Sequence, residues 1–97
     1  MTAISVAGFA TCPFHQRALK AAQQLVDAGK YSAVDDLTCE TRDEYQQWLA
    51  SDKPNFEDGR AETHTSSPFV FAGDTFIGGC DDTLALLAAA QSARGRL

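Results

Sequence analysis

The sequence is poor in basic residues and has no long hydrophobic run. Its 97 residues include 8 lysines and arginines against 13 aspartates and glutamates, which gives a net charge of −5. The basic residues are scattered, and this balance argues against electrostatic binding to nucleic acid or to an anionic membrane. No apolar stretch approaches the roughly 20 residues that span a bilayer, and residues 1–4 lack the basic segment of a secretory signal. We therefore expect neither a nucleic acid nor a membrane as partner.

Cysteine is also scarce, and its count is odd. The three cysteines are Cys12, Cys39 and Cys80, and an odd number does not suit a closed framework of disulfides. We therefore expect a reducing compartment, either the cytoplasm or an organelle matrix. A zinc site would draw on these cysteines together with His15 and His64, but the sequence has no second close pair of ligands beside Cys12 and His15. We expect no metal site built from protein side chains alone.

The pattern of apolar and polar residues predicts one α/β domain over residues 1–97. With 44% hydrophobic residues, the chain can form one modest core but not two. Spacing and turn residues predict strands at 3–9 and 32–37, a β-hairpin at 68–77, and helices over 13–28, from 41 to a break at Pro54, and from 80 onward. Residues 51–65 are expected to be a polar loop with at most one helical turn. The order β-α-β-α-β-β-α implies a four-stranded mixed sheet flanked by helices.

The predicted helices have recognisable ends and buried faces. Helical spacing places five apolar residues on one face of the first helix: Phe14, Ala18, Ala21, Ala22 and Leu25. Gly29 is a natural terminator for that helix. In the second helix, Thr41 and Glu44 have the form of a capping box. Tyr45 and Trp48 follow at helical spacing, and we interpret them as core residues.

Cys12 stands where a strand is expected to give way to a helix. Pro13 suits the first helical turn, because its missing N–H would have had no partner there. Cys12 then occupies the N-cap, where free backbone N–H groups and the positive end of the helix dipole favour a thiolate over a thiol. A reactive nucleophile is one interpretation. A small, half-buried residue that happens to cap a helix is the other.

Three short motifs occur in order along the chain. They are Cys12-Pro13-Phe14-His15 before a helix, Ser66-Ser67-Pro68 before a strand, and Gly78-Gly79-Cys80-Asp81-Asp82 before the last helix. Together they resemble the glutaredoxins, which have the thioredoxin-like fold, and the resemblance covers nearly the whole chain. It implies a nucleophilic role for Cys12 and a cis peptide bond before Pro68.

The resemblance also implies a binding site for glutathione. The backbone of Ser67, held by Pro68, would pair with the cysteinyl part of the tripeptide. The segment Gly79, Cys80 and Asp81 would receive its γ-glutamyl end. Residues 43–49 resemble the second helix of the family, which places Gln46 near the glycyl carboxylate, and Phe14 would line the groove.

The sequence departs from the family pattern at three places. His15 stands where dithiol members have a resolving cysteine, so the chain resembles a monothiol type. Phe9 replaces a lysine that is often found three residues before the nucleophile, which removes one positive charge from its surroundings. Residues 51–65 are longer than in compact members, which alters one wall of the site.

Four residues have roles that the sequence leaves open or assigns to packing. His15 follows Cys12 by one helical turn, so it could favour the thiolate or act as a base, or it could be a polar residue at a partly exposed helix start. Cys80 could form a disulfide with the nucleophile, as in some monothiol glutaredoxins, or merely contribute its amide. Cys39 is expected to be packed or at the surface, and His64 has no assigned role.

These features predict a glutathione-dependent thiol–disulfide oxidoreductase that reduces glutathione mixed disulfides through Cys12. Its partners would be glutathione as co-substrate and glutathionylated proteins or small disulfides, and the chain would be a monomer. One alternative is a dimer that holds a [2Fe–2S] cluster through Cys12 and glutathione, although the Cys-Gly-Phe-Ser motif typical of that branch is absent. Another is a glutathione-binding module with weak or no turnover, for which Phe9 is the best indication.

Overall fold

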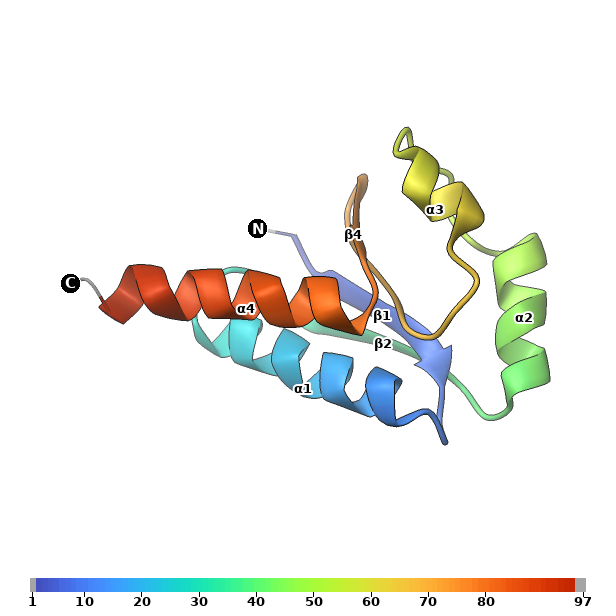
Figure 1. The fold of residues 1–97 in the computed structure, drawn as a ribbon, viewed down its shortest axis with the longest axis horizontal. Coiled ribbons are helices and arrows are strands. Elements are labelled where there is room, and N and C mark those ends of the chain that lie inside the picture. The colour runs from blue at the N-terminus through green and yellow to red at the C-terminus, as the bar shows by residue number, and fades with distance from the viewer. Residues whose placement is uncertain (1, 96–97) are drawn as a thin grey trace.

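The computed structural model describes residues 2–95, and the side chains of residues 2–92. Its elements follow the predicted order, and a short helix of five residues lies in the segment expected to be a loop with at most one helical turn (Figure 1). They are β1 (Ile4–Phe9), α1 (Pro13–Asp27), β2 (Val34–Cys39), α2 (Arg42–Ser51), α3 (Gly59–Thr63), β3 (Phe69–Ala72), β4 (Thr75–Gly78) and α4 (Cys80–Gly95).

The four strands form one mixed sheet in the order β2-β1-β3-β4. Strand β1 runs parallel to β2 and antiparallel to β3, and β3 and β4 form the predicted hairpin. The second strand begins and ends two residues later than expected, because its register on β1 pairs Ile4 with Val34 and Phe9 with Cys39. This pairing keeps Asp35 and Asp36 in the middle of an edge strand, where their side chains are exposed. The α/β class and the four-stranded mixed sheet are thus as predicted.

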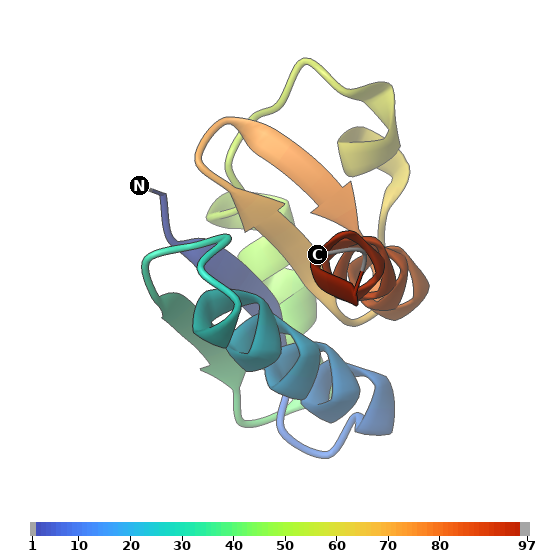
Figure 2. The same cartoon turned by 90° about the vertical axis from the view of Figure 1, so that its left-hand side faces the viewer.

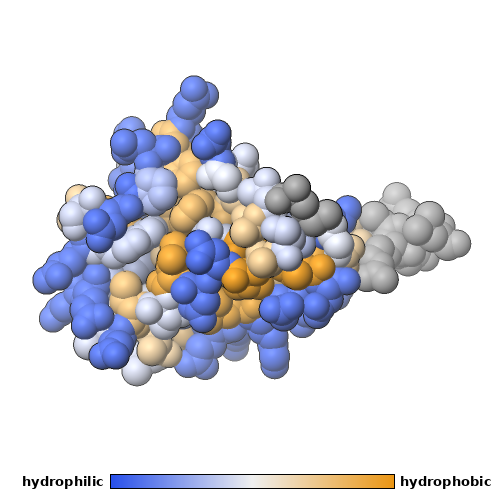
Figure 3. Space-filling view, turned by 180° about the vertical axis from the view of Figure 1, so that it is seen from behind, coloured by the Kyte–Doolittle hydropathy of each residue, from blue (hydrophilic) through white to orange (hydrophobic). Residues whose placement is uncertain are grey.

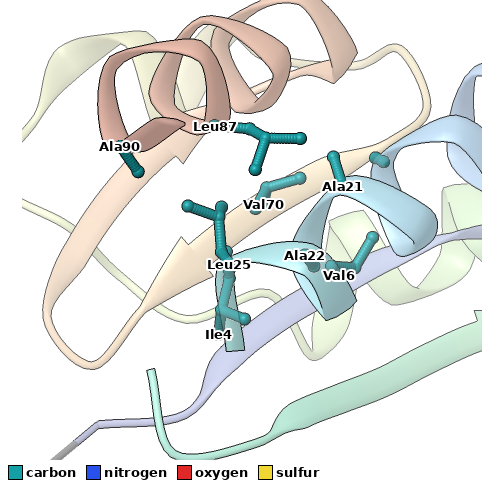
Figure 4. Close-up of a cluster of buried hydrophobic side chains, with 9 residues drawn as sticks. Ile4, Val6, Ala21, Ala22, Leu25, Val70, Leu87 and Ala90 are labelled. Atoms are coloured by element: carbon teal, nitrogen blue, oxygen red, sulfur yellow. The ribbon is translucent and has the colours of Figure 1, made fainter. Parts of the chain in front are cut away.

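Helices cover both faces of the sheet (Figure 2). On the face covered by α1 and α4, aliphatic side chains from both helices and from β1 and β3 point toward one another (Figure 4). On the face beside α2 and α3, the cluster is largely aromatic and is centred on Tyr45, Phe69 and Phe76. Tyr45 is fully buried and the Trp48 ring is stacked on it, as expected of core residues.

Residues 51–65 contain a short capped helix and pack against the sheet, which a polar loop would not be expected to do. Asp58 caps α3 by accepting a hydrogen bond from the backbone N–H of Arg60 at 2.9 Å. Ahead of it, the Phe56 ring packs against the rings of Phe69, Phe71 and Phe76. This segment therefore forms one wall of the aromatic core.

The first turn of α1 corrects one prediction. Phe14 was expected on the buried face, but it is 53% exposed, whereas the neighbouring His15 is completely buried. Both positions have helical spacing to Ala18, since they precede it by four and three residues. The approach of the helix to Gly8 on β1 turns position 15 toward the sheet. His15 is therefore not the partly exposed helix-start residue of the simpler interpretation.

Both apolar and hydrophilic side chains lie on the surface of the described residues. Seen from behind, apolar side chains gather in the middle of the face, with hydrophilic side chains around them (Figure 3). Across residues 2–95, none of the helices combines the length and apolarity that crossing a membrane requires.

Candidate functional site

Cys12 lies at the N-cap of α1, as predicted. Its backbone is extended, its N–H donates to the Phe9 carbonyl at 3.0 Å, and its own carbonyl accepts from Gln16 at 3.2 Å. The side chain makes no capping hydrogen bond, so the sulfur does not accept from the N–H groups of the first turn, although its N-cap position had led us to expect this. Instead the Cys12 Sγ lies 3.9 Å from the Ser67 carbonyl oxygen, and the residue is 6% exposed.

The segment that faces Cys12 is held in place from several sides. The Ser67–Pro68 peptide bond is cis, as the family resemblance implied. Tyr45 Oη donates to the Ser66 carbonyl at 2.8 Å, and the Gln46 amide donates to the Thr65 carbonyl at 3.3 Å. Burial, with Cys12 and Cys39 nearby, raises the pKa of Tyr45, so its hydroxyl stays a neutral donor. Helix α2 therefore fixes residues 65–67 beside the sulfur.

Two adjoining cavities meet at this segment, and we call them together the groove. The first, of about 370 Å³, includes Cys12, Arg42 and Gln46 in its lining. The second, of about 310 Å³, is lined in part by His64, Gly79, Cys80, Asp81 and Asp82. Phe14, Ser66 and Ser67 line both cavities. Each volume is near the lower end of the roughly 300–1,000 Å³ typical of small-molecule sites.

The two ends of the groove differ in charge. Arg42 supplies a cation to the cavity that contains Cys12, whereas Asp81 and Asp82 supply carboxylates to the other. A small molecule with a carboxylate at one end and an ammonium group at the other would match this distribution.

The structure brings most of the predicted site residues into the groove. Those that line it are Cys12, Phe14, Gln46, Ser67, Gly79, Cys80 and Asp81. Pro68 does not line either cavity, and its carbonyl lies 2.7 Å from His64 Nε2, which must donate to it. His15 lines neither cavity.

Arg42 and His64 line the groove but were not predicted. Arg42 precedes Gln46 by one helical turn, so helical spacing from Gln46 could have identified it. No sequence pattern points to His64, because its position depends on how residues 51–65 return to the sheet. There its ring packs against Phe69 and Phe76.

His15 lies behind the groove and contacts β2. Its Nε2 is 2.6 Å from Thr38 Oγ1, and Thr38 in turn donates to the Asp36 carboxylate. Burial lowers the pKa of His15, an effect that the nearby Asp36 carboxylate partly offsets. Because the ring has no exposed surface, this geometry does not support a direct role as base toward an incoming thiol.

The other two cysteines differ from Cys12 in their surroundings. Burial raises the pKa of Cys80, as do Asp81 and Cys12, while Arg17 acts in the opposite direction. Burial and then Glu44 raise the pKa of Cys39. Both residues are free thiols, as is Cys12. Their surroundings thus favour the protonated, less nucleophilic form.

The buried His15 should make the stability of the protein depend on pH. The unfolded chain takes up a proton at the ordinary histidine pKa of about 6.5, whereas the folded chain does so only at lower pH. The free energy of unfolding should therefore fall as the pH drops below about 6.5, until the lowered pKa is passed. Urea unfolding between pH 5 and 8 measures this slope, and His15→Gln should reduce it. An equal slope in both proteins would contradict the expectation.

A scan against protein-family models finds no family that matches this chain, and a search of curated proteins finds no match. The functional assignment therefore depends on the groove and on the sulfur beside it.

Proposed function

We propose that this chain is a glutathione-dependent thiol–disulfide oxidoreductase of the glutaredoxin type, with a thioredoxin-like fold and Cys12 as its single nucleophile. The observation that supports this most strongly is the position of the Cys12 sulfur. It lies at the start of α1, opposite the Ser67 carbonyl, in a groove that continues past Ser67 to the start of α4. Such a sulfur can attack a disulfide whose other half is held along the groove.

The groove offers a partner for each part of glutathione. Arg42 and the Gln46 amide suit the glycyl carboxylate, since both present N–H donors. The backbone of Ser67 would pair, strand-like, with the cysteinyl residue. Asp81 suits the γ-glutamyl ammonium group, and the backbone amides at the start of α4 suit its carboxylate.

The reaction then proceeds through two thiol–disulfide exchanges. The Cys12 thiolate attacks the glutathionyl sulfur of a mixed disulfide, the S–S bond breaks, and the substrate leaves as a thiolate that takes a proton from solvent. A second glutathione thiolate attacks the glutathionyl sulfur of the Cys12 adduct. Oxidised glutathione leaves and the Cys12 thiolate is regenerated. The net result is that one mixed disulfide and one free glutathione become one substrate thiol and one oxidised glutathione.

A monothiol route also fits the residues around Cys12. Position 15, where a resolving cysteine would stand in a dithiol enzyme, holds a buried histidine. Cys80 lines the second cavity, but its raised pKa disfavours the thiolate needed for attack.

Mapping a glutathione adduct tests this proposal. After incubation with oxidised glutathione, mass spectrometry of the digested protein should find one glutathionyl group on Cys12 and little on Cys39 or Cys80. The expected preference has a physical reason. Cys80 also lies at a helix start in the groove, but burial and Asp81 raise its pKa and favour the thiol, whereas Cys39 lines neither cavity. An adduct mainly on Cys39, or none at all, would contradict the proposal.

A further inference from the structure

Two buried polar atoms behind the groove lack a partner. Among the described residues, His15 Nδ1 and Ser67 Oγ are buried and make no hydrogen bond. Both lie against Gly8, because a Cβ added there would come within 2.6 Å of His15 Cγ and within 2.5 Å of Ser67 Oγ. Buried polar atoms without partners are uncommon in proteins and costly. That these two lie on the same glycine calls for a common explanation.

The direction of the neighbouring hydrogen bonds fixes which atom of His15 carries its proton. The Thr38 hydroxyl has one hydrogen, which it donates to the Asp36 carboxylate. Thr38 Oγ1 must then accept from His15, so the proton of the neutral ring is on Nε2. His15 Nδ1 is left with a free lone pair, which can accept a hydrogen bond but cannot donate one.

We propose that Ser67 Oγ donates to His15 Nδ1 and completes a hydrogen-bonded chain, Ser67–His15–Thr38–Asp36, that holds the Ser67 backbone toward Cys12. The bond requires Ser67 Oγ to move toward the ring by rotation about the Cα–Cβ bond of Ser67, and both atoms already lie against Gly8. Every member then has a partner of the correct type, from the buried hydroxyl at Ser67 to the exposed carboxylate at Asp36.

This hydrogen-bonded chain makes His15 a positioning residue. Ser67 presents its hydroxyl inward to the ring and its carbonyl to the Cys12 sulfur, so fixing the side chain also fixes the carbonyl. Ser67 lines both cavities, which makes its backbone the common wall of the groove. The functional consequence rests on the proposed function, but the hydrogen bonds themselves do not.

Nuclear magnetic resonance of ¹⁵N-labelled protein tests these hydrogen bonds without a measurement of activity. We expect His15 near neutral pH to be the neutral tautomer with its proton on Nε2. Ser67→Ala removes the donor to Nδ1 and should shift the Nδ1 resonance toward that of an unbonded ring nitrogen. A proton on Nδ1, or an unchanged Nδ1 resonance in Ser67→Ala, would overturn the proposal.

Kinetics with a glutathionylated peptide test the positioning role. Ser67→Ala should raise KM by about 3- to 10-fold with a smaller change in kcat, because the wall that binds glutathione loosens while the sulfur is unchanged. Thr38→Val should act in the same direction, and Thr38→Ser, which keeps the hydroxyl, should restore the wild-type KM. Thr75→Val, at an exposed position of β4, is the matched control and should leave KM unchanged.

The two measurements separate the possible failures. If Thr38→Val does not fold, Ser67→Ala still tests the hydrogen bond at the other end of the Ser67–His15–Thr38–Asp36 chain. A wild-type KM in folded Ser67→Ala would overturn the positioning role. If the wild type shows no turnover, the proposed function fails. The Nδ1 resonance of His15 still decides whether the proposed hydrogen bonds form.

Discussion

Replacing Cys12 with serine should reduce turnover of a glutathionylated peptide by on the order of 1,000-fold or more, to the level of the uncatalysed exchange. A serine hydroxyl is not ionised at neutral pH and cannot form the glutathionyl adduct. The groove should nevertheless remain intact, because the Cys12 side chain makes no capping bond and only a long contact to the Ser67 carbonyl. The measurement is the rate of thiol release at fixed glutathione concentration, with the uncatalysed rate subtracted.

Cys39→Ser is the matched control for this substitution. Cys39 lies at the end of β2, packs against the aromatic cluster and lines neither cavity. The same change of sulfur to oxygen there should leave turnover near the wild-type value. If Cys39→Ser lost as much activity as Cys12→Ser, the assignment of Cys12 as the nucleophile would be wrong.

The same experiment distinguishes a glutathione-binding module from an enzyme. A module without turnover would bind glutathione but show no exchange in the wild type, so Cys12→Ser would change nothing in the rate. Our proposal instead expects a large difference in rate between the two proteins and similar binding of a non-reactive glutathione analogue. Similar binding is expected because Arg42, Gln46 and Asp81 are unchanged in the variant.

Local signals in the sequence were enough to predict most of the fold. Thr41 caps α2 by accepting from the Glu44 N–H at 3.1 Å, as its motif indicated. The Glu44 carboxylate, however, accepts from the N–H of Glu40 instead of Thr41. Gly29, with a φ of 80°, follows the end of α1, where few other residues could adopt that conformation. These features depend on neighbours within a few residues, which a sequence displays directly.

The features that the sequence did not reveal depend on contacts between distant segments. His15 is buried because it lies on Gly8 of β1 and contacts Thr38 of β2, and neither contact can be inferred from the spacing within α1. Arg42 and His64 become part of the groove only when α2 and residues 51–65 pack beside Cys12. The motifs therefore located Cys12 and the two ends of the groove, but not the residues that support them.

Gly8 shows such a constraint between distant segments clearly, and Gly8→Ala should destabilise the protein strongly. The added methyl group would overlap the His15 ring and the Ser67 hydroxyl. His15 cannot move away easily, since it is fully buried and bonded to Thr38. Overpacking of this kind should lower the free energy of unfolding by about 2–3 kcal/mol. For a domain of this size, that corresponds to a drop in Tm of roughly 10 °C or more.

Gly59→Ala is the matched control, because it makes the same change where no atom lies within 4 Å of the new Cβ. Gly59 is the first residue of α3, and alanine there should leave stability unchanged or raise it slightly. Thermal unfolding of both variants gives the comparison.

In Gly8→Ala the methyl group also separates Ser67 from His15, so we expect a raised KM in whatever fraction remains folded. A Gly8→Ala protein as stable as Gly59→Ala would mean that the His15 ring does not lie against β1. The proposed hydrogen bond from Ser67 to His15 would then be wrong as well.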